Sequence, residues 1–118
     1  MEFWETTPYS KWYKSHRKFS FTAHHLIELY DEKQQIPDSI FKPFLKSVFC
    51  HSKGEEKLFQ SSLEKEKILD EHSKIQPSKQ YSHEEKYLFC KSLLQHMKEE
   101  EAILSNTWLL HRESASHV

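Results

Sequence analysis

Two segments of this chain share one pattern of histidine, glutamate and apolar residues. Residues 47–59 read SVFCHSKGEEKLF, and residues 92–104 read SLLQHMKEEEAIL. Aligned without a gap, both contain a serine, two apolar residues, a histidine, a lysine, two adjacent glutamates and a closing apolar pair at the same positions. A histidine and a glutamate four residues apart lie on one face of a helix. The repeat therefore predicts two helices that each present His-x-x-x-Glu on a single face.

A shorter match precedes each of these segments. His16 lies in SHRKF (residues 15–19) and His72 lies in EHSKI (residues 71–75); both read His-x-Lys followed by an apolar residue. The chain therefore reads as two helical hairpins of one plan, with a histidine on the first helix and His-x-x-x-Glu-Glu on the second. Four histidines have apolar residues at helical spacing, which predicts that they face the interior of a bundle. They are His16, His51, His72 and His96.

Four helical segments account for most of the chain. Ser82 with Glu85 has the signature of a capping box, and so has Ser61 with Glu64. Asp38 is suited to the N-cap of another helix. One glycine and four prolines leave little turn material, and sustained alternation of apolar and polar residues is absent, so a β fold is not expected. We predict an all-α, up-down-up-down four-helix bundle. Its helices should cover residues 10–34, 38–60, 61–76 and 82–110.

The length and composition fit one domain with a modest core and a charged exterior. The 118 residues are 36% hydrophobic and 30% charged, with a net charge of −1, which gives no basic field for nucleic acid or a membrane surface. No apolar run approaches the ~18 residues that span a bilayer. The two cysteines form no Cys-x-x-Cys pair and no secretory signal is visible, so we expect a cytoplasmic protein. We expect a single domain over 1–118, with an arm at about 1–9 and a frayed tail at about 111–118.

The predicted inward faces carry groups that are costly to bury. An unpartnered carboxylate or imidazole in an apolar interior costs several kcal/mol. Four imidazoles and two carboxylates can instead hold cations, because each carboxylate can bridge two ions and each ion can take two imidazoles. Nitrogen and oxygen ligands suit iron, with manganese or zinc as alternatives. The predicted ligands are His16, His51, Glu55, His72, His96 and Glu100.

This arrangement resembles the hemerythrin family, including the HHE cation-binding domains, over about residues 12–104. The family's order is His, then His-x-x-x-Glu, then His, then His followed four or five residues later by Glu or Asp. The same order is found here at His16, His51 with Glu55, His72, and His96 with Glu100 or Glu101. The resemblance implies a four-helix bundle with two iron ions in a non-haem di-iron centre, used for oxygen binding, oxygen or iron sensing, or iron handling.

Three positions leave alternatives or depart from the family pattern. Oxygen-carrying hemerythrins have a second histidine four residues before the one that matches His72, where this chain has Ile68. The family's spacing selects Glu101 as the last carboxylate, whereas the internal repeat selects Glu100, which we choose. On the first helix, His24 and the adjacent His25 are rivals of His16, and both the repeat and the apolar face favour His16. The other histidines, His83, His111 and His117, should be exposed to solvent.

The function expected from these residues is a di-iron domain that binds or senses O₂, another small diatomic ligand, or iron. The alternative is a metal-dependent regulatory module that binds a protein partner. Trp4, Phe21 and Trp108 are candidate contacts, although burial inside the N-terminal arm and the bundle end is the favoured explanation for these aromatic residues. No nucleophile–base pair or nucleotide-binding loop is readable, so a dedicated enzyme is not favoured. The only glycine, Gly54, falls inside a predicted helix beside Glu55. There it would allow either a close helix contact or a softened turn.

Overall fold

The computed structural model describes residues 3–60 and 62–116, and over these residues it contains four α-helices and no strand. The prediction of an all-α fold with four helices is therefore confirmed for the part of the chain described. Two short 3₁₀ helices, η1 (Phe3–Thr6) and η2 (Glu56–Phe59), accompany them. The α-helices are α1 (Ser10–Asp31), α2 (Asp38–Glu55), α3 (Lys65–Ser73) and α4 (His83–Ser116).

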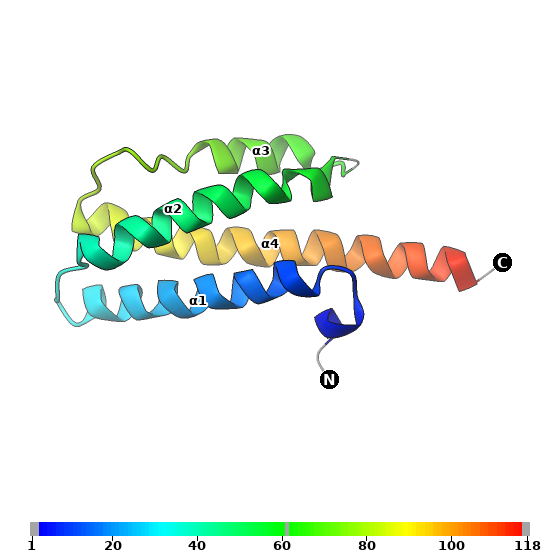
Figure 1. The fold of residues 1–118 in the computed structure, drawn as a ribbon, viewed down its shortest axis with the longest axis horizontal. Helices are drawn as coiled ribbons and strands as arrows, with labels where there is room; N and C mark the ends of the chain where they lie inside the picture. Colours follow the sequence, from blue (N-terminus) through cyan, green and yellow to red (C-terminus); the bar gives the residue numbers. More distant parts are fainter. Residues whose placement is uncertain (1–2, 61, 117–118) are drawn as a thin grey trace.

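The four helices lie along the long axis of the molecule (Figure 1). Helix α4 is the longest and extends beyond the others toward the C-terminus, and α1 packs along it. Helix α2 contacts both α1 and α3. Within the described residues, no helix is both long enough and apolar enough to cross a membrane.

Two apolar clusters form the core, and each takes residues that lie on, or directly after, every one of the four α-helices. The larger contains Ala23, Leu26, Ile36, Phe41, Phe44, Leu45, Val48, Ile75, Cys90, Leu93 and Met97. The smaller contains Trp4, Trp12, Phe59, Ile68 and Leu104, where Trp12 lies on α1, Phe59 on η2 directly after α2, Ile68 on α3 and Leu104 on α4. Along α1, α2 and α3 the predicted ligands fall between residues of the two clusters. On α4, Glu100 does so, and His96 lies at the end of the larger cluster, between Leu93 and Met97. The fold thus places these polar side chains between two layers of apolar ones.

Helix α1 ends earlier than residue 34 because the backbone turns into the left-handed region at Lys33, where φ is 62°. The N–H of Lys33 donates to the carbonyl of Tyr30 (2.9 Å), and the N–H of Gln34 donates to that of Leu29 (2.8 Å). This is a Schellman C-cap, which usually has glycine at the left-handed position. A lysine there gave no signal in the sequence.

Helix α2 begins at Asp38, but the predicted N-cap role of Asp38 is wrong. Pro37 occupies the cap position with extended backbone angles, and no side chain caps the helix. The Asp38 carboxylate instead lies 2.7 Å from the buried Nζ of Lys86, which lowers the pKa of Asp38. The same Nζ donates to the carbonyl of Ile36 (2.8 Å). Asp38 therefore ties the start of α2 to α4.

Helix α3 is shorter than the predicted segment, since it covers only Lys65–Ser73. Ser61 lies outside the described residues, so its predicted pairing with Glu64 is not described. The N–H of Glu64 donates to Ser62 Oγ (3.0 Å). After Ser73 the chain continues in turns, with the N–H of Ile75 donating to the carbonyl of His72 (3.1 Å).

The capping box at the start of α4 is confirmed. The N–H of Glu85 donates to Ser82 Oγ (3.1 Å), and the N–H of Ser82 donates to Glu85 Oε1 (3.0 Å). The predicted end at residue 110 is wrong, because α4 continues to Ser116. Residues 111–116 contain neither glycine nor proline, so no residue there stops a helix. The rest of the predicted tail, 117–118, lies outside the described residues.

The expected burial of the three candidate contact aromatics is confirmed for Trp4, holds in part for Trp108 and is wrong for Phe21. Trp4 is buried against the rings of Trp12 and Tyr13, at centroid distances of 5.6 and 5.2 Å. Trp108 is half-buried and lies edge-on to Tyr9. Phe21 alone of the three is exposed, at 79%. The N-terminal arm, which contains η1, therefore covers the smaller apolar cluster.

Gly54 lies in the last turn of α2, and the prediction of a close helix contact there is wrong. A Cβ built on Gly54 would meet no atom within 4 Å, and its φ is not positive. The chain changes from α to 3₁₀ geometry directly after Glu55, at Glu56. A locally softened turn is thus the only one of the two expectations that remains.

Replacing Gly54 by alanine should stabilise the protein by about 0.5–1 kcal/mol, because alanine has the better helix propensity and the site has room for a methyl group. Urea unfolding with an unchanged m-value would measure this. The matched control is Glu99→Ala, at the same position of the second repeat, where the propensities are similar and a smaller change is expected. Destabilisation by Gly54→Ala would instead show that the α2–η2 junction requires glycine.

Candidate metal centre

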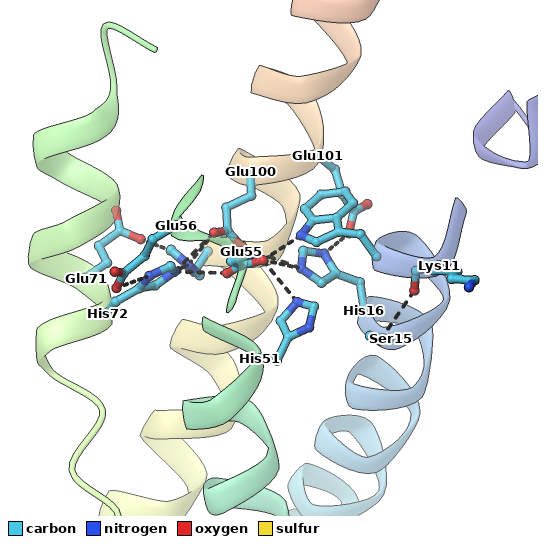
Figure 2. A network of polar contacts seen from close by, with 12 residues as sticks. Lys11, Ser15, His16, His51, Glu55, Glu56, Glu71, His72, Glu100 and Glu101 are labelled. Atoms are coloured by element: carbon cyan, nitrogen blue, oxygen red, sulfur yellow. Dashed lines mark hydrogen bonds and ion pairs between the residues drawn. The ribbon is translucent and has the colours of Figure 1, made fainter. Parts of the chain in front are cut away.

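Four histidines and two glutamates meet between the two apolar clusters. Figure 2 labels His16, His51 and His72 together with both glutamates, Glu55 and Glu100. Helices α1 and α3 each supply one histidine, and α2 and α4 each supply a histidine with a glutamate one turn later. Five of the six residues are buried, and His51 is partly buried. The structure thus brings together all six residues that the repeat selected: His16, His51, Glu55, His72, His96 and Glu100.

Glu55 lies between two pairs of imidazoles. Its Oε2 is 3.0 Å from His51 Nε2 and 3.5 Å from His16 Nε2. Its Oε1 is 3.0 Å from His72 Nε2. The two oxygens of this one carboxylate therefore face opposite halves of the cluster.

Glu100, on α4, also lies between the two pairs of imidazoles. Its Oε2 lies 3.2 Å from His72 Nε2 and 3.1 Å from His96 Nε2, and its Oε1 lies 3.5 Å from His16 Nε2. Each glutamate thus offers one oxygen to each pair of histidines. We define subsite A as His16 and His51 with Glu55 Oε2 and Glu100 Oε1. Subsite B is His72 and His96 with Glu55 Oε1 and Glu100 Oε2.

Three of the four imidazoles are held from behind by a further carboxylate. Nδ1 of His16 lies 2.9 Å from Glu101 Oε2, and Nδ1 of His72 lies 3.4 Å from Glu56 Oε1. Nδ1 of His96 is bonded to Glu71. An ionised carboxylate can only accept, so each Nδ1 carries the proton and donates it. In the neutral ring this leaves the Nε2 lone pair directed at the centre, as in metal-ligating histidines.

The sequence contained a signal for two of these outer carboxylates. Glu56 and Glu101 are the second glutamates of the two repeats, and each bonds to a histidine of a neighbouring helix. Glu101, weighed as an alternative ligand, thus lies behind His16, while Glu100 lies at the centre (Figure 2). Glu71 directly precedes His72, but nothing in the sequence linked it to His96.

Trp12 also contacts the cluster, which sequence reasoning missed because it assigned this residue to the apolar stripe. Its Nε1–H donates to Glu55 Oε2 (2.5 Å), and its ring centroid lies 4.1 Å from that of His16. No sequence pattern distinguishes an indole that donates to a buried carboxylate from one that only packs. Trp12 therefore joins the smaller apolar cluster to subsite A.

The cluster requires positive charge at its centre. The Nε2 atoms of His72 and His96 are 3.1 Å apart. At this distance only one of the two atoms can carry a proton that points toward the other. Burial lowers the pKa of His72, but its contacts with Glu100 and Glu55 outweigh this and raise the pKa to about 10. Burial likewise opposes the contacts of His16 with Glu101 and Glu55, which raise its pKa to about 9. Protons on these imidazoles supply the charge in the metal-free protein.

A divalent cation fits the residues present. Two buried atoms of subsite A lie near a group of opposite charge without making a hydrogen bond: His51 Nε2, 3.0 Å from Glu55 Oε2, and Glu100 Oε1, 3.5 Å from His16 Nε2. Leaving a buried polar atom unsatisfied costs about 1–3 kcal/mol, and a cation between these two atoms would satisfy both. The ligand atoms of Glu55, His72, His96 and Glu100 lie within 4.8 Å of one another, as do those of His16, His51 and Glu55. Buried His and Glu groups that could hold metal ions are therefore present.

The remaining histidines lie elsewhere. His24 and His25, the rivals of His16, are exposed on α1 and belong to neither group of converging ligand atoms. His83 is exposed as predicted. Its Nδ1 also accepts a hydrogen bond from the N–H of Ile36 (3.2 Å), a contact that was not predicted. The side chain of His111, and His117 as a whole, lie outside the described residues. Ile68 is buried in the smaller apolar cluster.

Comparisons with known proteins identified no relative of this chain. The chain matches no protein-family model, no curated protein and no solved structure.

Proposed function

We propose that this chain is a hemerythrin-like domain, an up-down-up-down bundle that binds a carboxylate-bridged pair of iron ions and, at that centre, O₂ or another small diatomic ligand. The observation that carries the proposal is the shared position of the two glutamates. Glu55 and Glu100 each face both pairs of imidazoles, with one oxygen for each pair. A dinuclear centre needs such bridging groups, whereas a single ion would leave half of these atoms unused.

The ligand set favours iron and leaves room for a further ligand. Each subsite offers two imidazole nitrogens and two carboxylate oxygens, a combination that suits iron, with manganese or zinc as alternatives. Four protein ligands do not fill the coordination positions of a six-coordinate ion. Bound ferrous ions would supply the electrons and the open positions that O₂ binding requires.

The chain's own residues would hold the centre in place and keep water from it. The carboxylates behind His16, His72 and His96 fix the ring orientation and direct each Nε2 inward. The two apolar clusters cover the centre along the bundle axis. The ring of Phe19 lies 5.2 Å from that of His51, the most exposed of the six residues. A dry, preorganised site of this kind would protect ferrous ions from water.

The proposal is tested by ferrous titration of metal-free protein under anaerobic conditions, followed by exposure to O₂. We expect two iron ions per chain, and an absorbance change in O₂ that reverses when O₂ is removed. The control is a His51→Ala/His72→Ala double variant, which lacks one imidazole from each subsite and should retain no iron after desalting. Failure of the wild-type protein to bind iron would overturn the proposal.

The alternative proposal is a metal-dependent regulatory module that binds a protein partner. It is favoured by the 79% exposure of Phe21 on α1. The same titration distinguishes the two functions. A chain that binds two ions, gains thermal stability and shows no spectral response to O₂ would support the module.

A further inference from the structure

The two halves of the cluster are related by the internal repeat, but they are not equivalent. Glu101 on α4 holds His16 on α1, and Glu56, the first residue of η2, holds His72 on α3, so a carboxylate behind the single histidine of a hairpin is present twice. A third histidine is also held by a carboxylate, and this contact has no counterpart in the other half of the cluster. Glu71, the residue before His72, holds Nδ1 of His96.

The position that corresponds to Glu71 is occupied by Ser15, the residue before His16. The hydroxyl of Ser15 donates to the carbonyl of Lys11 (3.4 Å), one turn earlier on the same helix (Figure 2). Among the described residues, no carboxylate is hydrogen-bonded to Nδ1 of His51. Subsite B therefore has two carboxylate-held imidazoles, and subsite A has one.

Two further observations weaken subsite A relative to subsite B. The indole N–H of Trp12 donates to Glu55 Oε2, the oxygen that faces subsite A, and so withdraws electron density from that ligand atom. The four ligand atoms of subsite B all converge within 4.8 Å of one another, whereas in subsite A only those of His16, His51 and Glu55 do so. Subsite B is thus the more preorganised of the two.

From these contacts we infer that subsite B binds a divalent metal ion more tightly than subsite A and is filled first. The inference rests on the proposed function, since it assumes that the cluster holds two ions. An outer carboxylate on a ligating histidine is worth about 10–100-fold in metal affinity. We therefore expect the affinity of subsite B to exceed that of subsite A by a factor in that range.

Stepwise binding to the wild-type chain alone would not test the inference. Two cations that share Glu55 and Glu100 repel each other, so the second ion binds more weakly even at identical subsites. The clean comparison uses variants that each retain one intact pair of histidines. His51→Ala leaves subsite B, and His96→Ala leaves subsite A.

The experiment is an anaerobic Co²⁺ titration of both variants, with the fold of each checked by circular dichroism. We expect one ion per chain in each case, bound 10–100-fold more tightly by His51→Ala than by His96→Ala. Equal affinities, or a tighter His96→Ala, would overturn the inference. Absence of Co²⁺ binding to the wild-type chain would overturn the proposed function as well, so the two failures are distinguishable.

A second pair of variants keeps all six ligands and therefore tests the inference even if a histidine variant does not fold. Glu71→Gln should weaken the first of the two binding steps, and Glu101→Gln should weaken only the second. Glu66→Gln, on the exposed part of α3, is the matched control and should change neither step. The opposite assignment of the two steps would show that subsite A fills first.

Discussion

Replacing Glu100 by glutamine should abolish the binding of both metal ions, although it changes only one ligand residue. Glu100 is fully buried, and its two oxygens face different subsites: Oε1 faces His16, and Oε2 faces His72 and His96. Glutamine keeps the size of the side chain but removes its charge and one of its oxygens. Loss of a carboxylate that only holds a ligating histidine from behind already lowers metal affinity about 10–100-fold. Loss of a carboxylate that ligates both ions should lower the affinity of both subsites by more than that. Iron content after anaerobic loading and desalting measures the effect.

Two control variants separate a shared ligand from a local one. Glu101→Gln removes the neighbouring carboxylate, which contacts only the back of His16, and should retain two ions at saturating metal. His51→Ala removes a ligand of subsite A alone and should retain one. If Glu100→Gln also retained one ion at the wild-type affinity, Glu100 would not be shared, and the bridged arrangement would be wrong.

The residues at the centre could be read from the sequence because helical periodicity alone determines which side chains share a face. His51 with Glu55, and His96 with Glu100, are separated by one helical turn, so their convergence does not depend on details of packing. The duplication removed most of the remaining ambiguity, since the alignment of the two repeats by itself favours Glu100 over Glu101. The capping box of Ser82 with Glu85 is similarly local, and it formed as predicted.

Features that depend on how the helices face each other could not be predicted. The contact of Glu71 with His96 joins α3 to α4, and that of Trp12 with Glu55 joins α1 to α2. Both require the relative rotation and offset of two helices, which periodicity within one helix does not determine. The left-handed Lys33 was missed for another reason, because a lysine carries no sequence signal for that conformation.

Metal loading at near-neutral pH should release at least two protons per chain. The raised pKa values of His16 and His72, about 9 and about 10, keep both imidazoles charged in the metal-free protein. An ordinary histidine, with a pKa of about 6.5, is mostly neutral at this pH and would release little. A metal ion needs the unprotonated Nε2, so binding must displace these protons. Calorimetric titration with Zn²⁺ in buffers of different ionisation enthalpy counts them.

The same protons make the stability of the metal-free protein depend on pH in a defined direction. A histidine whose pKa is raised on folding contributes stability that is complete below its unfolded pKa of about 6.5 and is lost as the pH rises through its folded value. The melting temperature of the metal-free chain should therefore fall between about pH 7 and pH 10, as His16 and His72 lose their protons. Glu55 acts at the other end of the range. Burial raises its pKa, but His16, His51 and His72 hold it well below the usual range, so its contribution is lost only on acidification below about pH 4.5.

Metal-loaded protein should keep its melting temperature over the alkaline range, because the cations replace the protons as the positive charge between the carboxylates. The stabilisation by metal should accordingly increase from pH 6 to pH 9. Glu101→Gln provides the internal check, since it removes the main contact that raises the pKa of His16 and should reduce the number of protons released. Release of less than one proton by the wild-type chain, together with a melting temperature that is flat from pH 7 to pH 10, would show that the imidazoles are neutral in the metal-free protein. Their lone pairs would then have to be satisfied by some other group at the centre.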